Sequence, residues 1–288
     1  MQNVIEVEQS HQKINWKNLT IIVSFHILTI AAFFTFSWEN FAVMIVGNWI
    51  VGSLGIGLGY HRLLTHRSFK APKWLEYTLT IFGAMAIQDD APKWVATHRI
   101  HHKFTEEEGD PHSTRPGFWW AHIGWIVRGT ANDHDHATLQ KYVPDLMKDK
   151  FHVALARFYY IPLIISGVIL FAVGGWSMVL WGVFARVVFG WHSTWLVNSA
   201  THYFGSRRFE TKDDSTNNWA IALLTFGEGW HNNHHAQPSR ARHGLTWYEF
   251  DLNWQTIRLF KKLGWAKQIR GNEPEKLPID LNPAPEIA

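Results

Sequence analysis

Histidines recur at spacings that suit metal binding in three separate parts of the chain. One stretch, from His98 to His112, reads HRIHHKFTEEEGDPH, and a later one, from His231 to His235, reads HNNHH. Both contain the pattern HxxHH, and an earlier stretch, HRLLTH, contains HxxxxH. Neutral imidazole is a common ligand of iron, copper, zinc and nickel. Because the chain has no cysteine, thiolate metal sites, disulfides and cysteine nucleophiles are excluded.

The spacing within each motif predicts where the rings point. Residues three and four apart share one face of an α-helix, so each HxxHH motif is expected to aim its three rings into one pocket. Residues five apart are turned about 140° beyond a full turn. The two histidines of HxxxxH should therefore reach two metals or lie across the end of a helix. Asn198 and His202 are four apart and share a face, and Trp195 continues that stripe.

The number of candidate ligands indicates more than one metal ion. A zinc ion usually takes four ligands, and nine histidines stand in these motifs or in the sequence NSATH. A set so rich in nitrogen would suit iron in redox chemistry, although the spacing alone does not exclude zinc. The nine candidates are His61, His66, His98, His101, His102, His202, His231, His234 and His235.

Four apolar stretches are long enough, or nearly so, to cross a bilayer as helices, which takes about 20 residues. They cover residues 19–36, 41–59, 158–174 and 177–198. Very short turns join the first to the second and the third to the fourth, so two antiparallel hairpins are expected. A fifth stretch, Leu75 to Ile87, is shorter and should form an interfacial or buried helix. Arg186, inside the fourth stretch, should face the bundle interior or a hydrated cavity.

The distribution of Lys and Arg predicts the orientation. The hairpin turns contain neither residue, whereas the N-terminal segment and the regions after the hairpins hold nearly all of them. By the positive-inside rule these parts face the cytoplasm, with all the histidine motifs on one side of the membrane. We therefore expect one all-α integral membrane domain, residues 1–288. It has four transmembrane helices in two hairpins, a cytoplasmic helical cap (60–157 and 199–270) that holds a two-metal site, and a tail (271–288).

Nucleic-acid binding finds no support in the sequence. The formal net charge is only +3, and no basic-aromatic cluster or glycine-rich phosphate loop occurs.

Taken together, the motifs resemble those of the integral-membrane fatty acid desaturases, particularly the delta-9, stearoyl-type branch. The bacterial and cyanobacterial acyl-lipid desaturases look most similar. The match covers roughly residues 20–265, and four segments follow the family's signatures in order and spacing. These are GYHRLLTHRSFKA (59–71), HRIHHKF…DPH (98–112), NSATHYFG (198–205) and GEGWHNNHHAQPS (227–239).

The resemblance implies a di-iron centre and dioxygen as co-substrate. It assigns the nine histidines as iron ligands and Asn198 as the residue that holds a metal-bound water. The implied reaction removes two hydrogens from neighbouring methylenes of a saturated acyl chain, leaves a cis double bond, and turns oxygen into water. The double bond is expected at the delta-9 position.

The resemblance also implies a hydrophobic tunnel for the acyl chain. Trp49 and Ser53 match the family's chain-length gate positions, and Trp195 matches a tunnel residue. We expect Trp49 to limit acyl length, although an ordinary interfacial Trp is an equal alternative. The nearest carboxylates in the sequence, Glu106, Asp110 and Glu228, are predicted to orient the imidazoles, although surface solvation explains Glu106 equally well.

Departures from the family bear on the substrate. Animal acyl-CoA enzymes carry an Arg-Asp pair where this chain has Ala96 and Thr97, and an Asn where it has Asp89. An acyl-lipid substrate is therefore expected, with acyl-CoA as the alternative. A related membrane hydroxylase or ketolase and a metal-binding membrane transporter are the competing functions.

The electron donor is expected to be a separate ferredoxin or small cytochrome, because no haem-binding His-Pro-Gly-Gly motif and no flavin fingerprint occurs in the chain. The basic stretch Arg258–Arg270 is either its docking site or a helix that lies on anionic membrane lipid. A bacterial inner or thylakoid-type membrane is the expected location, with both termini and the active site in the cytoplasm.

Overall fold

The computed structural model describes residues 13–128 and 134–271, and within them every regular element is a helix. Three isolated β-bridges, such as Lys70 with Lys267, tie loops together. The expected tail, 271–288, lies outside the described residues apart from Gly271. The elements are α2 (Trp16–Phe33), α3 (Trp38–Asn48), η1 (Trp49–Thr65), α4 (Lys73–Ala84), α5 (Ala91–Phe104), η2 (Trp120–Gly124), α6 (Trp125–Val127), α7 (His136–Tyr142), α8 (Pro144–Lys148), α9 (Lys150–Arg157), α10 (Ile161–Val179), η3 (Leu180–Ala185), α11 (Arg186–Asn198), η4 (Ala200–His202), α12 (Trp219–Leu224), α13 (His231–Ala236) and α14 (Leu252–Lys262).

Three of the described helices are long and apolar enough to cross a membrane. The first is α2, whose N-terminus is capped by Asn15 through a 3.0 Å bond from the Asn18 backbone N–H. The second joins α3 and η1 without a break, from Trp38 to Thr65, and Ser37 caps its start. The third runs from Ile161 to His202.

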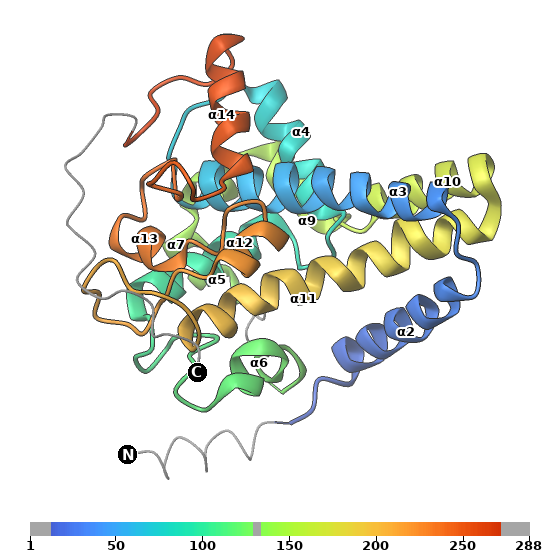
Figure 1. Cartoon of the computed structure of the whole chain (residues 1–288), viewed down its shortest axis with the longest axis horizontal. Coiled ribbons are helices and arrows are strands. Elements are labelled where there is room, and N and C mark those ends of the chain that lie inside the picture. Colours follow the sequence, from blue (N-terminus) through green and yellow to red (C-terminus); the bar gives the residue numbers. More distant parts are fainter. Residues whose placement is uncertain (1–12, 129–133, 272–288) are drawn as a thin grey trace.

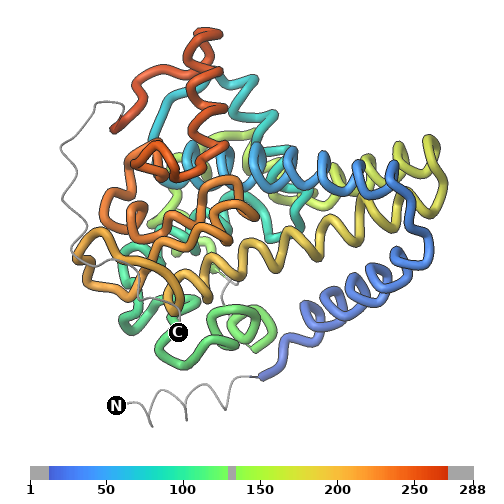
Figure 2. The backbone as a smooth tube through the Cα atoms, in the orientation of Figure 1, coloured from blue at the N-terminus to red at the C-terminus, as the bar shows by residue number. Residues whose placement is uncertain are grey.

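The third helix folds back on itself at Gly175. This glycine has φ 66°, a left-handed conformation outside the helical range. Residues on either side of it meet, since a Cβ on Gly182 would lie 2.6 Å from the Leu170 side chain. Figures 1 and 2 show the chain reversing at this bend, so that η3 and α11 lead away from it in the direction opposite to α10, which packs against η3.

The second apolar helix is longer than the sequence predicts. Residues 41–59 were expected to cross the membrane, and the helix that contains them continues to Thr65, so that it carries His61 beyond the apolar stretch. The polar types of Tyr60, His61 and Arg62 gave no sign of this continuation. In the structure Tyr60 and Arg62 are fully buried, so burial against the cap sustains the helix beyond its apolar part.

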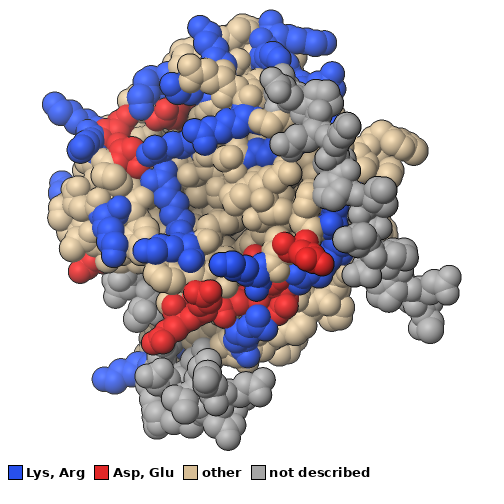
Figure 3. All heavy atoms as spheres, turned by 90° about the vertical axis from the view of Figure 1, so that its left-hand side faces the viewer, with Lys and Arg blue, Asp and Glu red and all other residues tan. Residues whose placement is uncertain are grey.

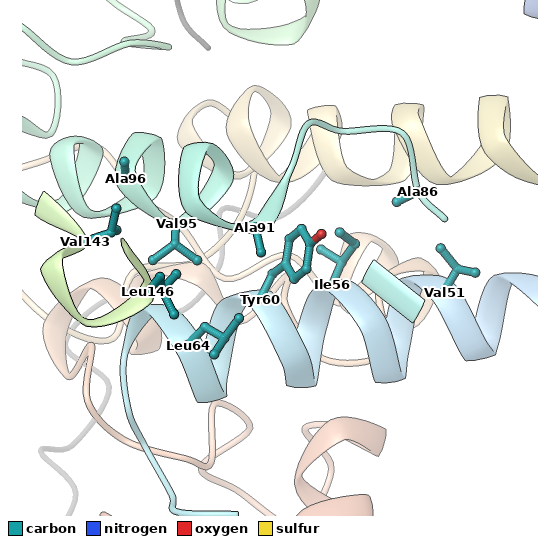
Figure 4. Close-up of a cluster of buried hydrophobic side chains, with 10 residues drawn as sticks. All are labelled: Val51, Ile56, Tyr60, Leu64, Ala86, Ala91, Val95, Ala96, Val143 and Leu146. Atoms are coloured by element: carbon teal, nitrogen blue, oxygen red, sulfur yellow. The ribbon is translucent and has the colours of Figure 1, made fainter. Parts of the chain in front are cut away.

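The cap elements gather at the end of the molecule away from the Gly175 bend (Figure 1). One core cluster there joins η1 to α5, two helices that carry histidine motifs, and to the segment around α8. Figure 4 shows Tyr60 and Leu64 of η1 facing Val95 of α5, with Val143 and Leu146 beside them. This apolar contact fixes the spacing between the two helices, and so between their imidazoles.

α4 packs against η1 through glycines. The predicted interfacial or buried stretch, 75–87, forms this helix, with Leu79 buried and Trp74 half exposed. A Cβ on Gly55 would lie 2.4 Å from the Gly83 backbone nitrogen, and one on Gly83 would meet the Tyr60 ring at the same distance. The two helices therefore approach as closely as backbones allow.

Arg186 faces the interior of the helix bundle and is 3% exposed. Its Nε donates to the Gly182 carbonyl at 2.9 Å, and Nη2 donates to the Met85 carbonyl at 3.0 Å.

Substituting Gly55 by Ala is expected to destabilise the protein by about 1–3 kcal/mol, the usual cost of overpacking a tight core. Gly167→Ala is the matched control, because a Cβ there makes an ordinary 3.6 Å contact with Val183. Thermal unfolding in detergent would measure both. Equal midpoints for the two variants would contradict the close packing of α4 on η1.

Candidate metal centre

The structure brings all nine predicted histidines together, in two adjacent groups. Within each group the candidate ligand atoms lie within 4.8 Å of one another. The five-histidine cluster consists of His61, His66, His98, His102 and His234, and the four-histidine cluster consists of His101, His202, His231 and His235. The rings come from η1, α5, η4 and α13, so the centre depends on how four helices are placed.

Each HxxHH motif is divided between the two clusters, which corrects the expectation of one pocket for each motif. In α5, His98 and His102 belong to the five-histidine cluster, whereas His101 belongs to the other. In α13, His231 and His235 stay together and His234 crosses over. Residues four apart differ by about 40° around a helix, but neighbours differ by about 100°. Adjacent histidines therefore point to different sites.

His61 and His66 share one cluster, so the alternative in which HxxxxH reaches two metals is wrong. η1 has π-helical geometry, in which hydrogen bonds join residues five apart. The His66 backbone N–H donates to the His61 carbonyl at 3.1 Å, and the ring centroids are 4.7 Å apart. His66 follows the last residue of η1. This agrees with the other alternative, in which HxxxxH lies across the end of a helix.

The inward nitrogens of the clusters form a set of converging lone pairs. His61 Nε2 lies 3.1 Å from His234 Nε2, which lies 2.9 Å from His102 Nε2. In the other cluster, His231 Nε2 lies 3.1 Å from His202 Nε2. Where Nδ1 carries the proton, Nε2 has only a lone pair. Such lone pairs repel one another unless a cation lies between them, so the donor set fits metal ions.

Some inward nitrogens have no hydrogen-bond partner at all. Among the described residues, Nε2 of His66, His101 and His235 is buried and unpartnered. A buried polar atom without a partner is costly, and a metal bond would satisfy each one.

Burial keeps the rings in the form that metals bind. Together with the neighbouring histidines, it holds the pKa of His98, His102, His231 and His234 well below the ordinary value. Burial lowers the pKa of His235 to about 4, against the opposing effect of Asp213. At neutral pH these imidazoles are neutral, which metal coordination requires.

Carboxylates lie against the outer nitrogens of four cluster histidines. The three carboxylates singled out from the sequence are here: His61 Nδ1 lies 2.6 Å from Glu228, His101 Nδ1 2.9 Å from Asp110, and His202 Nδ1 2.8 Å from Glu106. Each such contact selects the tautomer whose Nε2 is free for a metal.

Asp213 is a fourth carboxylate of this kind that the sequence did not point to. It lies 3.0 Å from His235 Nδ1. Burial disfavours its ionised form, but the contacts with His235 and Ser215 together outweigh burial and lower the pKa of Asp213. It stands 22 residues before His235, in a loop with no motif spacing, so no local pattern marks it.

Arg62, inside the HxxxxH motif, ties the centre to the C-terminal part of the cap. It is fully buried and donates to Glu228 Oε1 at 2.8 Å, to both oxygens of Asp251 at 2.9 and 3.1 Å, and to the Ala241 carbonyl. Asp251 also accepts hydrogen bonds from the His243 and Gly244 backbone N–H groups. Glu228 is therefore held in position between Arg62 and His61.

Two histidines outside the predicted set adjoin the centre. The His243 ring lies 4.5 Å from His234, with Nδ1 3.3 Å from Glu228. The His112 ring lies 4.2 Å from His101. Neither histidine was predicted as a ligand from its spacing in the sequence. Both lie outside the two clusters, each next to a cluster histidine.

Two cavities meet beside the clusters. The larger, about 310 Å³, reaches from Asn15, Lys17 and Lys93 to the centre, and Trp195 lines it. The second runs away from the centre between η1 and α11. Both include the same four residues next to the metal centre: Trp94, His98, Thr194 and Asn198.

The other predicted tunnel residues lie elsewhere. Trp49 is 39% exposed, and neither Trp49 nor Ser53 lines the two cavities described here. Ser53 is buried and donates to Asn253 Oδ1 at 2.6 Å.

Asp213→Asn is expected to weaken metal binding about 10–100-fold, the usual effect of losing a carboxylate behind a histidine ligand. Asp214→Asn is the control, because the Asp214 carboxylate is half exposed and pairs with Arg115 instead of a cluster histidine. Metal content after dialysis against a chelator would be measured by elemental analysis. Equal metal retention in the two variants would show that Asp213 does not support the centre.

Comparison with known proteins agrees with this architecture. The model of the fatty acid desaturase family matches residues 36–263. An sn-1 stearoyl-lipid 9-desaturase of Anabaena variabilis is 47% identical over 90% of this chain and 94% of that protein. An sn-2 palmitoyl-lipid 9-desaturase of Nostoc is 43% identical over 91% of this chain and 93% of that protein.

A relative with a different named substrate also matches. An acyl-CoA 5-desaturase of Anemone leveillei is 40% identical over 92% of this chain and 85% of that protein. The family model covers the apolar helices from Trp38 onward and all the histidine motifs. The chain is an enzyme that belongs to the fatty acid desaturase family.

Proposed function

We propose that the protein is a di-iron desaturase that introduces a cis delta-9 double bond into a saturated acyl chain carried on a lipid. The observation that carries the proposal is the meeting of two cavities at a pair of histidine clusters. A chain that passes through both cavities would place a middle methylene beside the metals. The relatives named as stearoyl-lipid and palmitoyl-lipid 9-desaturases support the substrate class and the position.

The nine histidines would hold two iron ions, and Asn198 would hold a metal-bound water. When bound, the irons would supply the oxidising power, with dioxygen as the oxidant, to remove hydrogen from an unactivated carbon. The protein's own residues position the imidazoles and the acyl chain. Glu106, Asp110, Glu228 and Asp213 orient the imidazoles and select their tautomers, burial keeps the rings neutral, and the cavity walls exclude water from the reacting carbon.

The mouth of the larger cavity favours a lipid headgroup over CoA. Lys17 and Lys93 line it together with Asp89, so positive and negative groups are mixed. Burial and the neighbouring Asp90 raise the pKa of Asp89 to about 6, and it is largely ionised at neutral pH. A polyphosphate such as CoA would meet this carboxylate. Acyl-CoA remains the alternative substrate, and one relative carries that name.

Four membrane spans in two hairpins follow from the three apolar helices, because the third reverses at Gly175. The distribution of Lys and Arg supports a cytoplasmic position for the cap, both termini and the metal centre. Figure 3 views the cap end of the molecule and shows many Lys and Arg side chains over that face. A bacterial inner or thylakoid-type membrane is the proposed location, and the relatives from Anabaena and Nostoc support it.

Electrons would come from a separate ferredoxin or small cytochrome that binds the cap. The segment Arg258–Arg270 fits a lipid surface better than a protein partner. Leu259 and Leu263 are about half exposed beside the exposed Lys261 and Lys262, and the Trp265 ring contacts that of Trp74 at 5.0 Å. Mixed apolar and basic exposure is typical of helices that lie on anionic membranes.

Expression in a host that lacks unsaturated acyl chains tests the function. The wild type is expected to produce a cis delta-9 alkene first in one lipid class, and His202→Ala should abolish the product because it removes a metal ligand. His136→Ala, an exposed histidine outside the clusters, should leave activity unchanged. Lipid-resolved mass spectrometry gives the position, chain length and headgroup.

The competing functions give different products in the same assay. A hydroxylase or ketolase would yield an alcohol or ketone instead of an alkene. A metal transporter would leave acyl chains unchanged and consume no oxygen with acyl substrate.

A further inference from the structure

A short helix of the cap is apolar on all its sides. α12 has the sequence WAIALL, and no Lys, Arg, Asp or Glu occurs in residues 215–227 around it. A helix with apolar residues all round is normally buried in a protein core or in a membrane. Ile221 and Ala222 are buried, but Trp219 is 72% exposed and Leu223 is 56% exposed. The outer side of α12 therefore lacks a protein cover among the described residues.

The turn after α12 reaches the part of η1 that is expected to lie in the membrane. A Cβ on Gly52 would be 3.5 Å from the Phe226 ring, and Gly52 lies inside the apolar stretch 41–59. Gly59 follows it by seven residues, which corresponds to about 10 Å of helix. α12 itself packs beside α11, as Figure 1 shows. The helix and its turn thus contact two of the helices that are proposed to span the membrane.

Backbone groups at both ends of α12 are satisfied by the protein itself. The Asn218 side chain accepts hydrogen bonds from the Ala220 and Ile221 backbone N–H groups, both at 3.1 Å. At the other end, the Gly227 N–H donates to the Ala222 carbonyl at 2.8 Å. Acyl chains offer no hydrogen bonds to a backbone, so polar groups among them need partners within the protein. These bonds suit a helix that lies among acyl chains.

Aromatic side chains extend the apolar surface of α12. Tyr203 and Phe204 are exposed, and the Asn218 amide donates to the Phe204 carbonyl at 2.9 Å, which holds this segment beside α12. The Phe118 ring, next to the exposed Trp119, lies 5.8 Å from that of Tyr203. Trp and Tyr are enriched where a membrane protein passes from acyl chains to headgroups. We call the following residues the α12 surface: Trp119, Tyr203, Phe204, Trp219, Leu223 and Leu224.

The segment that ends α12 also forms part of the wall of the second cavity. Leu224, Thr225 and Phe226 line this cavity together with Gly52 of η1. Leu223 does not line it and is exposed on the outside. An acyl chain in the cavity would therefore be separated from the surroundings of the protein by this one segment.

We propose that the α12 surface is inserted into the cytoplasmic leaflet of the bilayer, where lipid acyl chains cover it. The second cavity then borders lipid along α12 instead of water. A second copy of the chain would also cover an apolar surface, but the contact of Phe226 with Gly52 favours lipid, because it places the segment at the depth of the acyl chains. This inference rests on the proposed placement of the apolar helices in a membrane and adds a lipid-binding surface on the cap.

The test uses single cysteines, which the cysteine-free chain allows without removal of native thiols. Leu223→Cys and Trp219→Cys are each labelled with bimane and reconstituted, one copy per nanodisc, in phosphatidylcholine and phosphatidylglycerol. Discs with and without bromine on the acyl chains of phosphatidylcholine are compared, since bromine quenches a fluorophore that it contacts. Ile165→Cys, at an exposed position of α10, is the membrane control. Glu108→Cys, in an exposed acidic loop, is the aqueous control.

Brominated lipid is expected to quench the labels at positions 223 and 219 as it quenches the label at 165, and to leave the label at 108 unchanged. Iodide dissolved in the buffer should quench only the label at 108. Trp219→Cys keeps the test valid if Leu223→Cys folds poorly. The labels report position and not turnover, so the result does not depend on whether the enzyme makes an alkene.

The controls separate the inference from the membrane placement on which it rests. If the label at 165 is not quenched by brominated lipid, the proposed membrane placement fails. If that label is quenched and neither label on α12 is, only the inference is overturned. Quenching of the α12 labels by iodide would then show a surface in water, and protection from both quenchers would show a cover made of protein.

Discussion

The mutual repulsion of buried imidazole lone pairs is the constraint on which this structure depends. Nitrogens such as Nε2 of His61 and His234 approach to 3.1 Å, and where both Nδ1 atoms carry the proton, the two Nε2 lone pairs face each other. A positive ion between them makes that arrangement favourable, and each of the two adjacent clusters could hold one. The surrounding protein must then hold the rings in place before any ion binds. Many contacts within the cap hold the imidazole rings in place.

The rings are held from behind as well as from their own helices. Carboxylates on the outer nitrogens fix the tautomers, and Arg62 in turn fixes Glu228 and Asp251. A charge as deeply buried as Arg62 is tolerated because all its donor groups are paired. The same guanidinium joins the end of a membrane helix to the C-terminal loop. The metal centre and the cap are therefore parts of one network.

Burial within the membrane limits how the polar groups of the channel can be satisfied. In an apolar surrounding, a buried polar group cannot be compensated by solvent. The larger cavity has charged residues such as Lys17 and Asp89 in its lining, whereas the exposed lining of the second is mostly apolar. An acyl lipid has the matching order of polar headgroup and apolar chain. The carbon of the acyl chain that lies at the metal centre is then set by its distance from the headgroup.

Residue types and their spacing determined the metal chemistry, the helical class and the family from the sequence alone, because local periodicity controls which residues share a helix face. The apolar stretches likewise fall largely within the three long apolar helices of the described structure. Only the tertiary structure decided how each HxxHH motif divides, since that depends on where two sites lie relative to the helix. It also decided that π-helical geometry joins His61 to His66, and that Asp213 lies against His235. Contacts between segments far apart in the chain leave no periodic trace in the sequence, and so those residues could not be found there.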